Sequence, residues 1–254
     1  MKKEKLYLST IAADADEEAR DRGLGVEIAE YCTAWNMDPE NFPGTDAQVR
    51  EEIAGVSRLV FHAPFNELFP SAIDPRAVQL AHDRLVQAAK LASEQYGVHR
   101  MVVHSGFVPQ LYFPSWYLER AVPFFRELLA SIPPETCLFV ENVLEEDPAL
   151  LRQLAEGISD PRLRLCLDVG HAHYRSPVPV EEWLEALAPY IGHFHIHNND
   201  GSFDTHSDLG DGTIAMAPLL RRIEALCPNA TVTLETLMDG PSLDWLAAQG
   251  LLED

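Results

Sequence analysis

The chain is poor in basic residues. Its 254 residues include 19 Lys and Arg against 40 Asp and Glu, which gives a formal net charge of −21 at pH 7. A charge of this size repels polyanions and opposes the counterion release that drives nucleic-acid binding. Residues 33–46 and 66–74 contain no Lys or Arg, although an enzyme acting on duplex DNA needs phosphate contacts from such loops. We therefore expect a small-molecule substrate, and these features disfavour a nucleic-acid partner.

Cysteines and long apolar runs are also scarce. The cysteines are scattered and form no Cys-x-x-Cys pair, which favours free thiols in a reducing compartment. They are Cys32, Cys137, Cys166 and Cys227. No run of about 18 apolar residues occurs, and the first five residues lack the apolar stretch of a signal peptide. We expect a cytoplasmic protein that does not contact a membrane.

Short apolar runs alternate with amphipathic segments eight times, which is typical of a parallel sheet built from βα units. The expected strands are 6–9, 25–31, 59–62, 101–104, 138–142, 163–168, 192–197 and 231–235. Helical spacing of apolar residues marks 75–96, 116–129, 147–154, 180–187 and 217–226. No linker or repeat divides the chain. We therefore predict the α/β class and a single (β/α)8 TIM barrel over residues 1–254.

Six of these apolar runs end on a residue that can bind a divalent metal. In chain order these residues are His62, His104, Glu141, Asp168, His195 or His197, and Glu235. Because the carboxyl ends of barrel strands converge at one rim, we expect the six side chains to lie together. A single histidine at a strand end is more often hydrogen-bonded than metal-bound, but the repetition favours metal. The three buried carboxylates would each need a cation or hydrogen-bond donors.

Three further candidate ligands follow the sixth and seventh strands, namely His171, Asp204 and His206. Mixed nitrogen and oxygen donors suit zinc or manganese better than magnesium or calcium. Nine donors exceed the four that one tetrahedral zinc uses, so two or three ions bridged by carboxylates could be held. His171 could equally contact the substrate or hold another ligand in place. His195 and His197 share one strand face, so alternation alone leaves the choice between them open.

The motifs around these residues resemble the xylose isomerase-like superfamily of (β/α)8 barrels. That superfamily joins sugar and sugar-phosphate isomerases and epimerases with apurinic endonucleases of the endonuclease IV type. The motifs are His-Ala-Pro-Phe at 62–65, Val-His-Ser-Gly at 103–106, Val-Glu-Asn at 140–142, Cys-Leu-Asp-Val-Gly-His at 166–171, His-Ile-His-Asn at 195–198, Asp-Thr-His at 204–206, Leu-Gly-Asp-Gly at 209–212 and Leu-Glu at 234–235. In the superfamily the seventh-strand histidine precedes Asp or Asn by three residues, as His195 precedes Asn198, which favours His195 over His197.

The resemblance implies two chemistries. In the isomerases and epimerases, the positions of Glu141, Asp168, His195 and Glu235 hold one ion, and the two glutamates act as acid and base. In the endonuclease, all nine positions hold three zinc ions. Isomerases often carry an arginine soon after the seventh-strand histidine, whereas residues 201–206 contain no Lys or Arg.

The negative net charge and the loops without Lys or Arg lead us to favour a metal-dependent isomerase or epimerase. It would act on a small sugar or sugar phosphate and use zinc or manganese. Glu141, Glu235 and His171 are its candidate catalytic residues. The alternative is an endonuclease IV-like phosphoesterase, either an apurinic endonuclease or a hydrolase of small phosphodiesters, with up to three zinc ions. A barrel that binds metal without catalysis is a third hypothesis, which the ring of polar strand ends disfavours. The substrate and the oligomeric state stay open.

Overall fold

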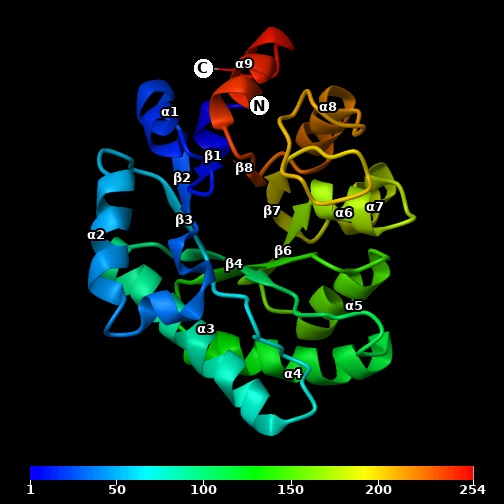
Figure 1. The fold of residues 1–254 in the computed structure, drawn as a ribbon. Helices are drawn as coiled ribbons and strands as arrows, with labels where there is room; N and C mark the ends of the chain where they lie inside the picture. The colour runs from blue at the N-terminus through cyan, green and yellow to red at the C-terminus, as the bar shows by residue number, and fades with distance from the viewer. Residues whose placement is uncertain (254) are drawn as a thin grey trace.

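The computed structural model describes residues 1–253, and in it eight parallel strands close into a barrel in chain order (Figure 1). The strands are β1 (Leu6–Ser9), β2 (Gly25–Ile28), β3 (Leu59–His62), β4 (Arg100–His104), β5 (Cys137–Glu141), β6 (Leu163–Asp168), β7 (Ile191–Ile196) and β8 (Thr231–Leu234). The prediction of a single TIM barrel is confirmed.

Helices cover the outside of this barrel (Figure 1). They are α1 (Ala15–Arg22), α2 (Phe42–Glu52), α3 (Pro75–Tyr96), α4 (Pro114–Ser131), α5 (Ala149–Ile158), α6 (Val169–Arg175), α7 (Val180–Leu187), α8 (Met216–Leu226) and α9 (Asp239–Ala248). The five predicted helices are present. The predicted bounds of α3 and α7 match the structure, and α4 continues through Pro123.

The differences from the predicted elements have local causes. The strand expected over 25–31 ends at Ile28, because a short 3-10 helix, η2 (Glu30–Cys32), follows it. Four helices were not predicted, namely α1, α2, α6 and α9. Helix α1 is mostly charged and buries only Ala15 and Ala19, and α2 buries only Val49. Neither helix has the apolar stripe that a periodicity search detects.

Two apolar layers position the site. The larger layer lies between the strands and the helices, and a smaller cluster fills the barrel interior. The interior cluster consists of Tyr7, Val60, Val102, Phe139 and Cys166. Since side chains on a strand alternate between two faces, the residues two positions further along the same strands also face inward. These residues are Ser9, His62, His104, Glu141 and Asp168.

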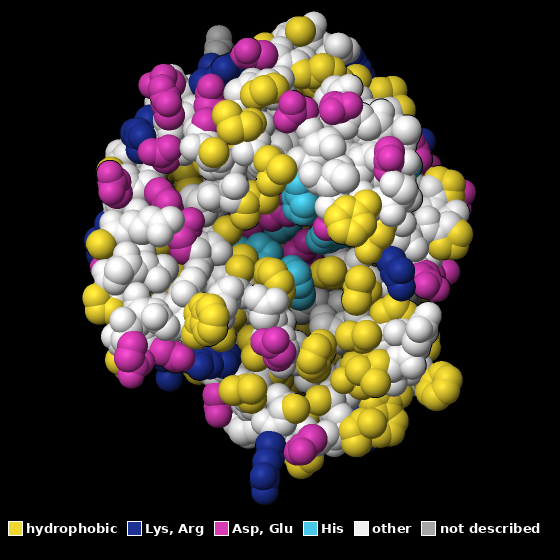
Figure 2. Space-filling model, in the orientation of Figure 1, with side chains coloured by type: hydrophobic (Ala, Val, Ile, Leu, Met, Phe, Trp, Pro, Cys, Tyr) yellow, Lys and Arg dark blue, Asp and Glu magenta, His cyan; other side chains and the backbone are white. Residues whose placement is uncertain are grey.

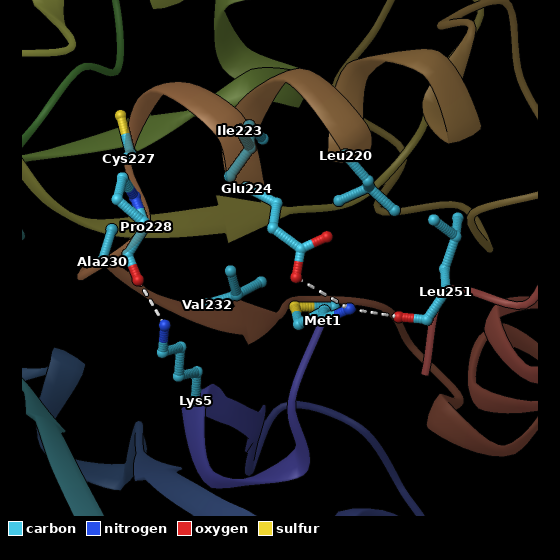
Figure 3. A pocket seen from close by; sticks show the side chains of 10 residues that line it. All are labelled: Met1, Lys5, Leu220, Ile223, Glu224, Cys227, Pro228, Ala230, Val232 and Leu251. Atoms are coloured by element: carbon cyan, nitrogen blue, oxygen red, sulfur yellow. Dashed lines mark hydrogen bonds and ion pairs between the residues drawn. The ribbon is translucent and has the colours of Figure 1, made fainter. Parts of the chain in front are cut away.

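The amino-terminal end of the barrel offers little room. A cavity of about 30 Å³ lies there between α8, β8 and the start of the chain, which is space for about one water molecule (Figure 3). The amino group of Met1 donates to the Leu251 carbonyl at 2.7 Å and pairs with Glu224 at 3.3 Å. This cavity is too small for a substrate. No helix within residues 1–253 is long and apolar enough to cross a bilayer.

Candidate metal centre

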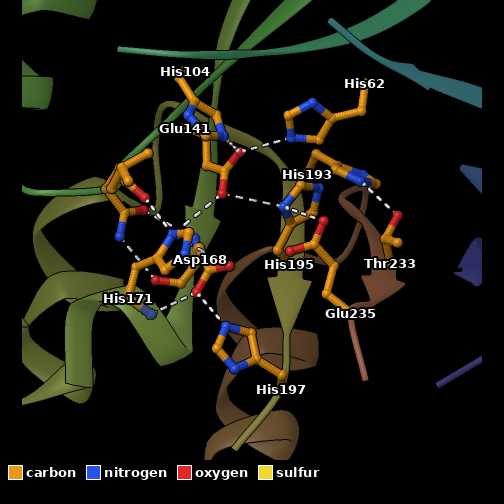
Figure 4. Close-up of polar contacts among 12 residues, drawn as sticks. His62, His104, Glu141, Asp168, His171, His193, His195, His197, Thr233 and Glu235 are labelled. Carbon is orange, nitrogen blue, oxygen red and sulfur yellow. Dashed lines mark hydrogen bonds and ion pairs between the residues drawn. The ribbon is translucent and has the colours of Figure 1, made fainter. Parts of the chain in front are cut away.

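Three neighbouring strand ends bring together the first group of candidate ligands. Strands β3, β4 and β5 end on His62, His104 and Glu141. The Nε2 atoms of both histidines lie 3.4 Å from Oε2 of Glu141, and the three side chains point toward one another (Figure 4). Two donors bound tetrahedrally to one zinc ion lie roughly 3.4 Å apart. The spacing therefore fits a shared ion.

A second group shares Glu141 with the first. Its members are Glu141, Asp168, His195 and Glu235, all buried, with ligand atoms within 4.8 Å of one another. Nδ1 of His195 lies 3.3 Å from Oε1 of Glu141 and 3.2 Å from Oε1 of Glu235. Glu141 thus presents one oxygen to each group. The geometry places His195, and not His197, beside the two glutamates.

The third group contains the remaining predicted residues. It consists of His171, His197, Asp204 and His206. The Nε2 atoms of His171 and His206 lie 3.1 and 3.4 Å from Oδ2 of Asp204. Nε2 of His197 lies 3.6 Å from Oδ1 of the same carboxylate. All nine predicted ligands therefore line one opening, and His197 adds a tenth donor.

The turn from β6 into α6 positions two of these side chains. Asp168 ends β6 and caps α6, because its Oδ1 accepts the backbone N–H of His171 at 2.7 Å. Asn142 holds this turn against β5: its side chain donates to the Asp168 carbonyl and accepts the Asp168 N–H, both at 2.9 Å. The short Asp-Val-Gly-His spacing therefore aims both a carboxylate and an imidazole at the centre.

The loop after β7 is folded back onto its own strand. Asn198 and Ser207 form an antiparallel bridge through two backbone hydrogen bonds of 3.0 and 2.9 Å. This return brings Asp204 and His206 over the end of the barrel. His206 has a backbone φ of 47°, a left-handed conformation that costs a non-glycine residue energy and often marks a functional site.

Backbone carbonyls set the tautomers of three histidines. Nδ1 of His62 donates to the Ala63 carbonyl at 2.9 Å, and Nδ1 of His171 donates to the Asn142 carbonyl at 2.9 Å. Nδ1 of His206 donates to the Glu235 carbonyl at 2.6 Å. Because a carbonyl can only accept, each Nδ1 carries the proton. In the neutral ring, Nε2 is then left with a lone pair facing the carboxylates, as metal binding requires.

The Glu27 carboxylate fixes the tautomer of His195. Glu27 was not among the residues predicted from the sequence. Its Oε1 accepts from Nε2 of His195 at 3.0 Å, while its Oε2 accepts from Nε2 of His193 at 3.1 Å and from the Thr233 hydroxyl at 2.6 Å. Glu27 is fully buried inside the barrel. One feature of the sequence could have revealed it. Glu27 is the only charged residue in the strand Gly25–Ile28, and strand alternation turns its side chain toward the barrel interior.

The acidic and imidazole groups shift one another's protonation. Burial opposes ionisation of Glu141, but His195 and His104 outweigh it and lower the Glu141 pKa well below its usual value. Burial lowers the pKa of His104 to about 3, which keeps that ring neutral. Burial also opposes charge on His206, yet Asp204 and Glu235 raise its pKa to about 9. The cluster attracts positive charge, as protons or as metal ions.

Several donor atoms at the centre have no hydrogen-bond partner although they are buried. These atoms are Glu141 Oε2, Asp168 Oδ2, His195 Nδ1, both ring nitrogens of His197, and Asp204 Oδ1. Leaving buried polar atoms unpaired is costly. All of them belong to residues of the groups described above. A divalent cation in each group would satisfy all of these atoms except Nδ1 of His197, because one ion binds only one nitrogen of a ring. The residues present therefore fit zinc or manganese in this mixed nitrogen and oxygen environment.

Comparison with known proteins agrees with this architecture. Residues 17–253 match the xylose isomerase-like TIM barrel family. An uncharacterised protein of Methanocaldococcus jannaschii is 27% identical over 191 residues, which are 70% of this chain and 64% of that protein. The chain thus spans less than two thirds of the length of this curated relative.

Three solved structures extend the comparison. A Thermus thermophilus protein from crystals soaked with zinc chloride is 28% identical and superimposes with a TM-score of 0.77 over 96% of this chain and 97% of that chain. A D-tagatose 3-epimerase-like protein is 21% identical, with a TM-score of 0.76 over 96% of both chains. Endonuclease IV from Thermus thermophilus is 23% identical, with a TM-score of 0.64 over 96% of this chain and 98% of that chain. The last two likenesses, below 25% identity, are likenesses of fold.

Proposed function

The chain belongs to the xylose isomerase-like TIM barrel family, and from this we propose that it is a divalent-metal-dependent hydrolase of a small phosphoester. One observation carries the proposal: donors beyond the four of a single-ion site form two additional groups around the same opening. These further donors are His62, His104, His171, Asp204 and His206. Sequence alone placed isomerisation first. The sequence could not show that these side chains converge on one opening. Their convergence leads us to rank phosphoester hydrolysis ahead of isomerisation.

Two carboxylates, Glu141 and Asp204, link the other candidate ligands. Glu141 joins the first two groups through its two oxygens, and Asp204 is contacted by both His171 and His206. Zinc or manganese ions bound there would stabilise negative charge on phosphoryl oxygens and activate water as the nucleophile. Phe65 stacks on the His104 ring with centroids 4.2 Å apart, and this apolar side chain shields one face of the first group from water.

Charge restricts the substrate to small molecules. The net charge of −21 and the absence of Lys and Arg from residues 33–46 and 66–74 disfavour a nucleic-acid duplex. A small phosphodiester needs no such contacts, because a centre occupied by cations would bind the phosphoryl group directly. We therefore place a small phosphodiester ahead of an abasic-site duplex.

The test combines elemental analysis with hydrolysis of bis(4-nitrophenyl) phosphate by the zinc-loaded and the manganese-loaded protein. We expect close to three ions per chain and measurable hydrolysis. Asp204→Asn should lose about one ion and lower kcat at least a hundredfold. Asp200→Asn, an exposed residue of the same loop, is the matched control and should retain both. Three bound ions with no hydrolysis of this diester, or of an abasic-site duplex at low salt, would refute the proposal.

Isomerisation or epimerisation of a small sugar or sugar phosphate is the second candidate. It is supported by the second group, where the Glu141 and Glu235 carboxylates both lie beside Nδ1 of His195 and could move a proton between carbons of a metal-bound substrate. One ion per chain, together with deuterium uptake into a sugar carbon in heavy water, would favour this function over hydrolysis.

A further inference from the structure

Exposed apolar side chains gather at the same end of the barrel as the candidate metal centre. Of the ten large apolar side chains that are exposed among the described residues, eight lie in loops between a strand and the following helix. They are Ile11, Trp35, Ile73, Leu111, Phe113, Phe203, Leu237 and Met238. Figure 2 shows hydrophobic side chains around the hollow that holds the histidines and acidic groups. Such a concentration marks a binding surface.

The same loops carry no cation. None of the segments that connect a strand to the next helix contains Lys or Arg. The basic residue that follows β6 is Arg175, at the end of α6, and it already contacts the Leu144 carbonyl at 3.5 Å and Glu146 at 3.6 Å. A ligand with several phosphates or a polyanionic backbone therefore finds no counter-charge on this rim. The part of a substrate outside the metal centre meets apolar and acidic side chains and no Lys or Arg of these loops.

One part of this rim encloses a cavity. A cavity of about 380 Å³ lies between the loops that follow β4 and β5. Its apolar wall includes Phe107, Leu111, Tyr112, Phe113 and Leu150. Pockets of this size accommodate small ligands, mostly by apolar contact with a few polar groups.

Chain connectivity places part of the cavity wall within roughly 10 Å of the first group, because a residue of extended chain spans at most about 3.6 Å. Phe107 follows the candidate ligand His104 by three residues, and Glu145 follows Glu141 by four. Three acidic residues also line the cavity, and each has a partner. Glu146 pairs with Arg175 at 3.6 Å, and Asp147 accepts from the Ala149 N–H at 2.6 Å. Glu145 accepts from the Ser105 hydroxyl and, at 2.8 Å, from the Val143 N–H. These contacts leave the apolar wall facing the space.

We propose that this cavity binds an apolar, non-reacting group of the substrate while the phosphoester lies at the candidate metal centre. The substrate class is then an amphiphilic phosphoester, and not a sugar phosphate or a nucleic acid. This inference rests on the proposed function for the position of the phosphoryl group. The evidence for the cavity as an apolar site is its wall of Phe107, Leu111 and Phe113 and the lack of Lys and Arg in the surrounding loops.

The first experiment compares two diesters that share one leaving group. 4-Nitrophenyl ethyl phosphate and 4-nitrophenyl hexyl phosphate differ only by four methylenes in the non-reacting ester, so their intrinsic reactivities are matched. With zinc-loaded protein we expect kcat/KM to be at least tenfold higher for the hexyl ester, mainly through KM. The second experiment measures binding without turnover, by calorimetry with ethylphosphonate and hexylphosphonate. We expect hexylphosphonate to bind at least tenfold more tightly.

Variants of the cavity wall locate the effect. Phe113 is 80% exposed, so Phe113→Ser removes the aromatic surface without opening the core. We expect this variant to lower the hexyl-to-ethyl ratio at least threefold, in both kcat/KM and affinity. Leu111→Ser should act in the same direction. Leu226→Ser removes an exposed apolar side chain from α8, far from these loops in the fold, and should leave the ratio unchanged.

Several results would overturn either the inference about the cavity or the proposed function. A ratio near one in the unmodified protein, or a ratio that Phe113→Ser and Leu111→Ser leave intact, overturns the inference. If Phe113→Ser instead converts an oligomer to a monomer, the rim is a contact between copies of the chain and the inference fails. If neither diester is hydrolysed at full metal occupancy, the proposed function fails, while the two phosphonates still report whether the apolar cavity binds the alkyl group.

Discussion

Oε1 of Glu27 lies 3.0 Å from Nε2 of His195 inside the barrel. A carboxylate accepts a hydrogen bond, so Nε2 of the imidazole carries the proton and Nδ1 is left with its lone pair toward Glu141 and Glu235. A residue that touches no substrate thereby decides which nitrogen is available to a metal ion. Carboxylate partners of this kind raise the basicity of the ligand and hold its ring in place.

The first prediction concerns this carboxylate. Glu27→Gln should weaken binding of the ion beside His195 by about 10- to 100-fold, because the charge that orients the imidazole is lost. Zinc affinity measured by competition with a chromogenic chelator checks this. Asp239→Asn, which replaces another buried carboxyl group whose Oδ1 accepts from the Thr236 hydroxyl, is the control. An unchanged affinity in Glu27→Gln would show that the contact is structural only.

Metal removal should also destabilise the fold. Without cations, the buried carboxylates of Glu141, Asp168 and Glu235 keep only histidines as partners. A ligand present at 1,000 times its Kd stabilises a protein by about 4 kcal/mol. For a domain of this size we therefore expect a chelator to lower Tm by roughly 10 °C. Differential scanning calorimetry before chelation, after it, and after zinc is returned tests the expectation. A Tm that does not respond would argue against metal in the native protein.

Gly170 and Gly44 should respond in opposite directions to alanine. A Cβ at position 170 would overlap the ring of His197, so Gly170→Ala should cost about 1–3 kcal/mol through overpacking. A Cβ at position 44, within α2, meets nothing within 4 Å. Gly44→Ala should stabilise the protein by about 0.4–1 kcal/mol, since it removes freedom from the unfolded chain. Urea denaturation measures both, and equal effects would contradict the close packing of α6 on β7.

Asp239 gives stability a pH dependence. Burial raises its pKa to about 8, with Asp14 and Glu18 adding to the effect. The folded state therefore binds a proton more tightly than the unfolded state, whose reference pKa is 3.8. Its contribution is fully present below pH 3.8 and is lost as the pH rises through about 8.

Asp239→Asn should remove this loss. We expect the Tm of the variant to exceed that of the unmodified protein by several degrees at pH 8 and by less at pH 5. Thermal unfolding at a series of pH values tests this, and Asp83→Asn, at an exposed position on α3, controls for the removal of one negative charge. A Tm difference that is independent of pH would show that Asp239 is ionised throughout the range.

The predictability of each element follows from its pattern. Helix α3 could be predicted to the residue, since its apolar stripe starts after Asp74, which caps Arg76 N–H, and stops at Gly97 in a left-handed conformation. Helices α1 and α2 lack such a stripe and escaped detection. The end of β2 was missed because Glu30–Cys32 form a 3-10 helix, and Glu30 and Tyr31 make hydrogen bonds to Thr10 and Tyr96, which are distant in sequence.

The barrel and the identity of its candidate ligands followed from the amino-acid sequence, because strand alternation and short apolar runs are local properties of the chain. His62, Glu141 and Asp168 were identifiable in this way. The folded structure was needed to show how those donors divide into groups and which ring nitrogen each imidazole offers. It was also needed to show that Glu27 supports His195 across 168 positions of chain. These relations are distances between residues far apart in sequence, and no local pattern encodes them.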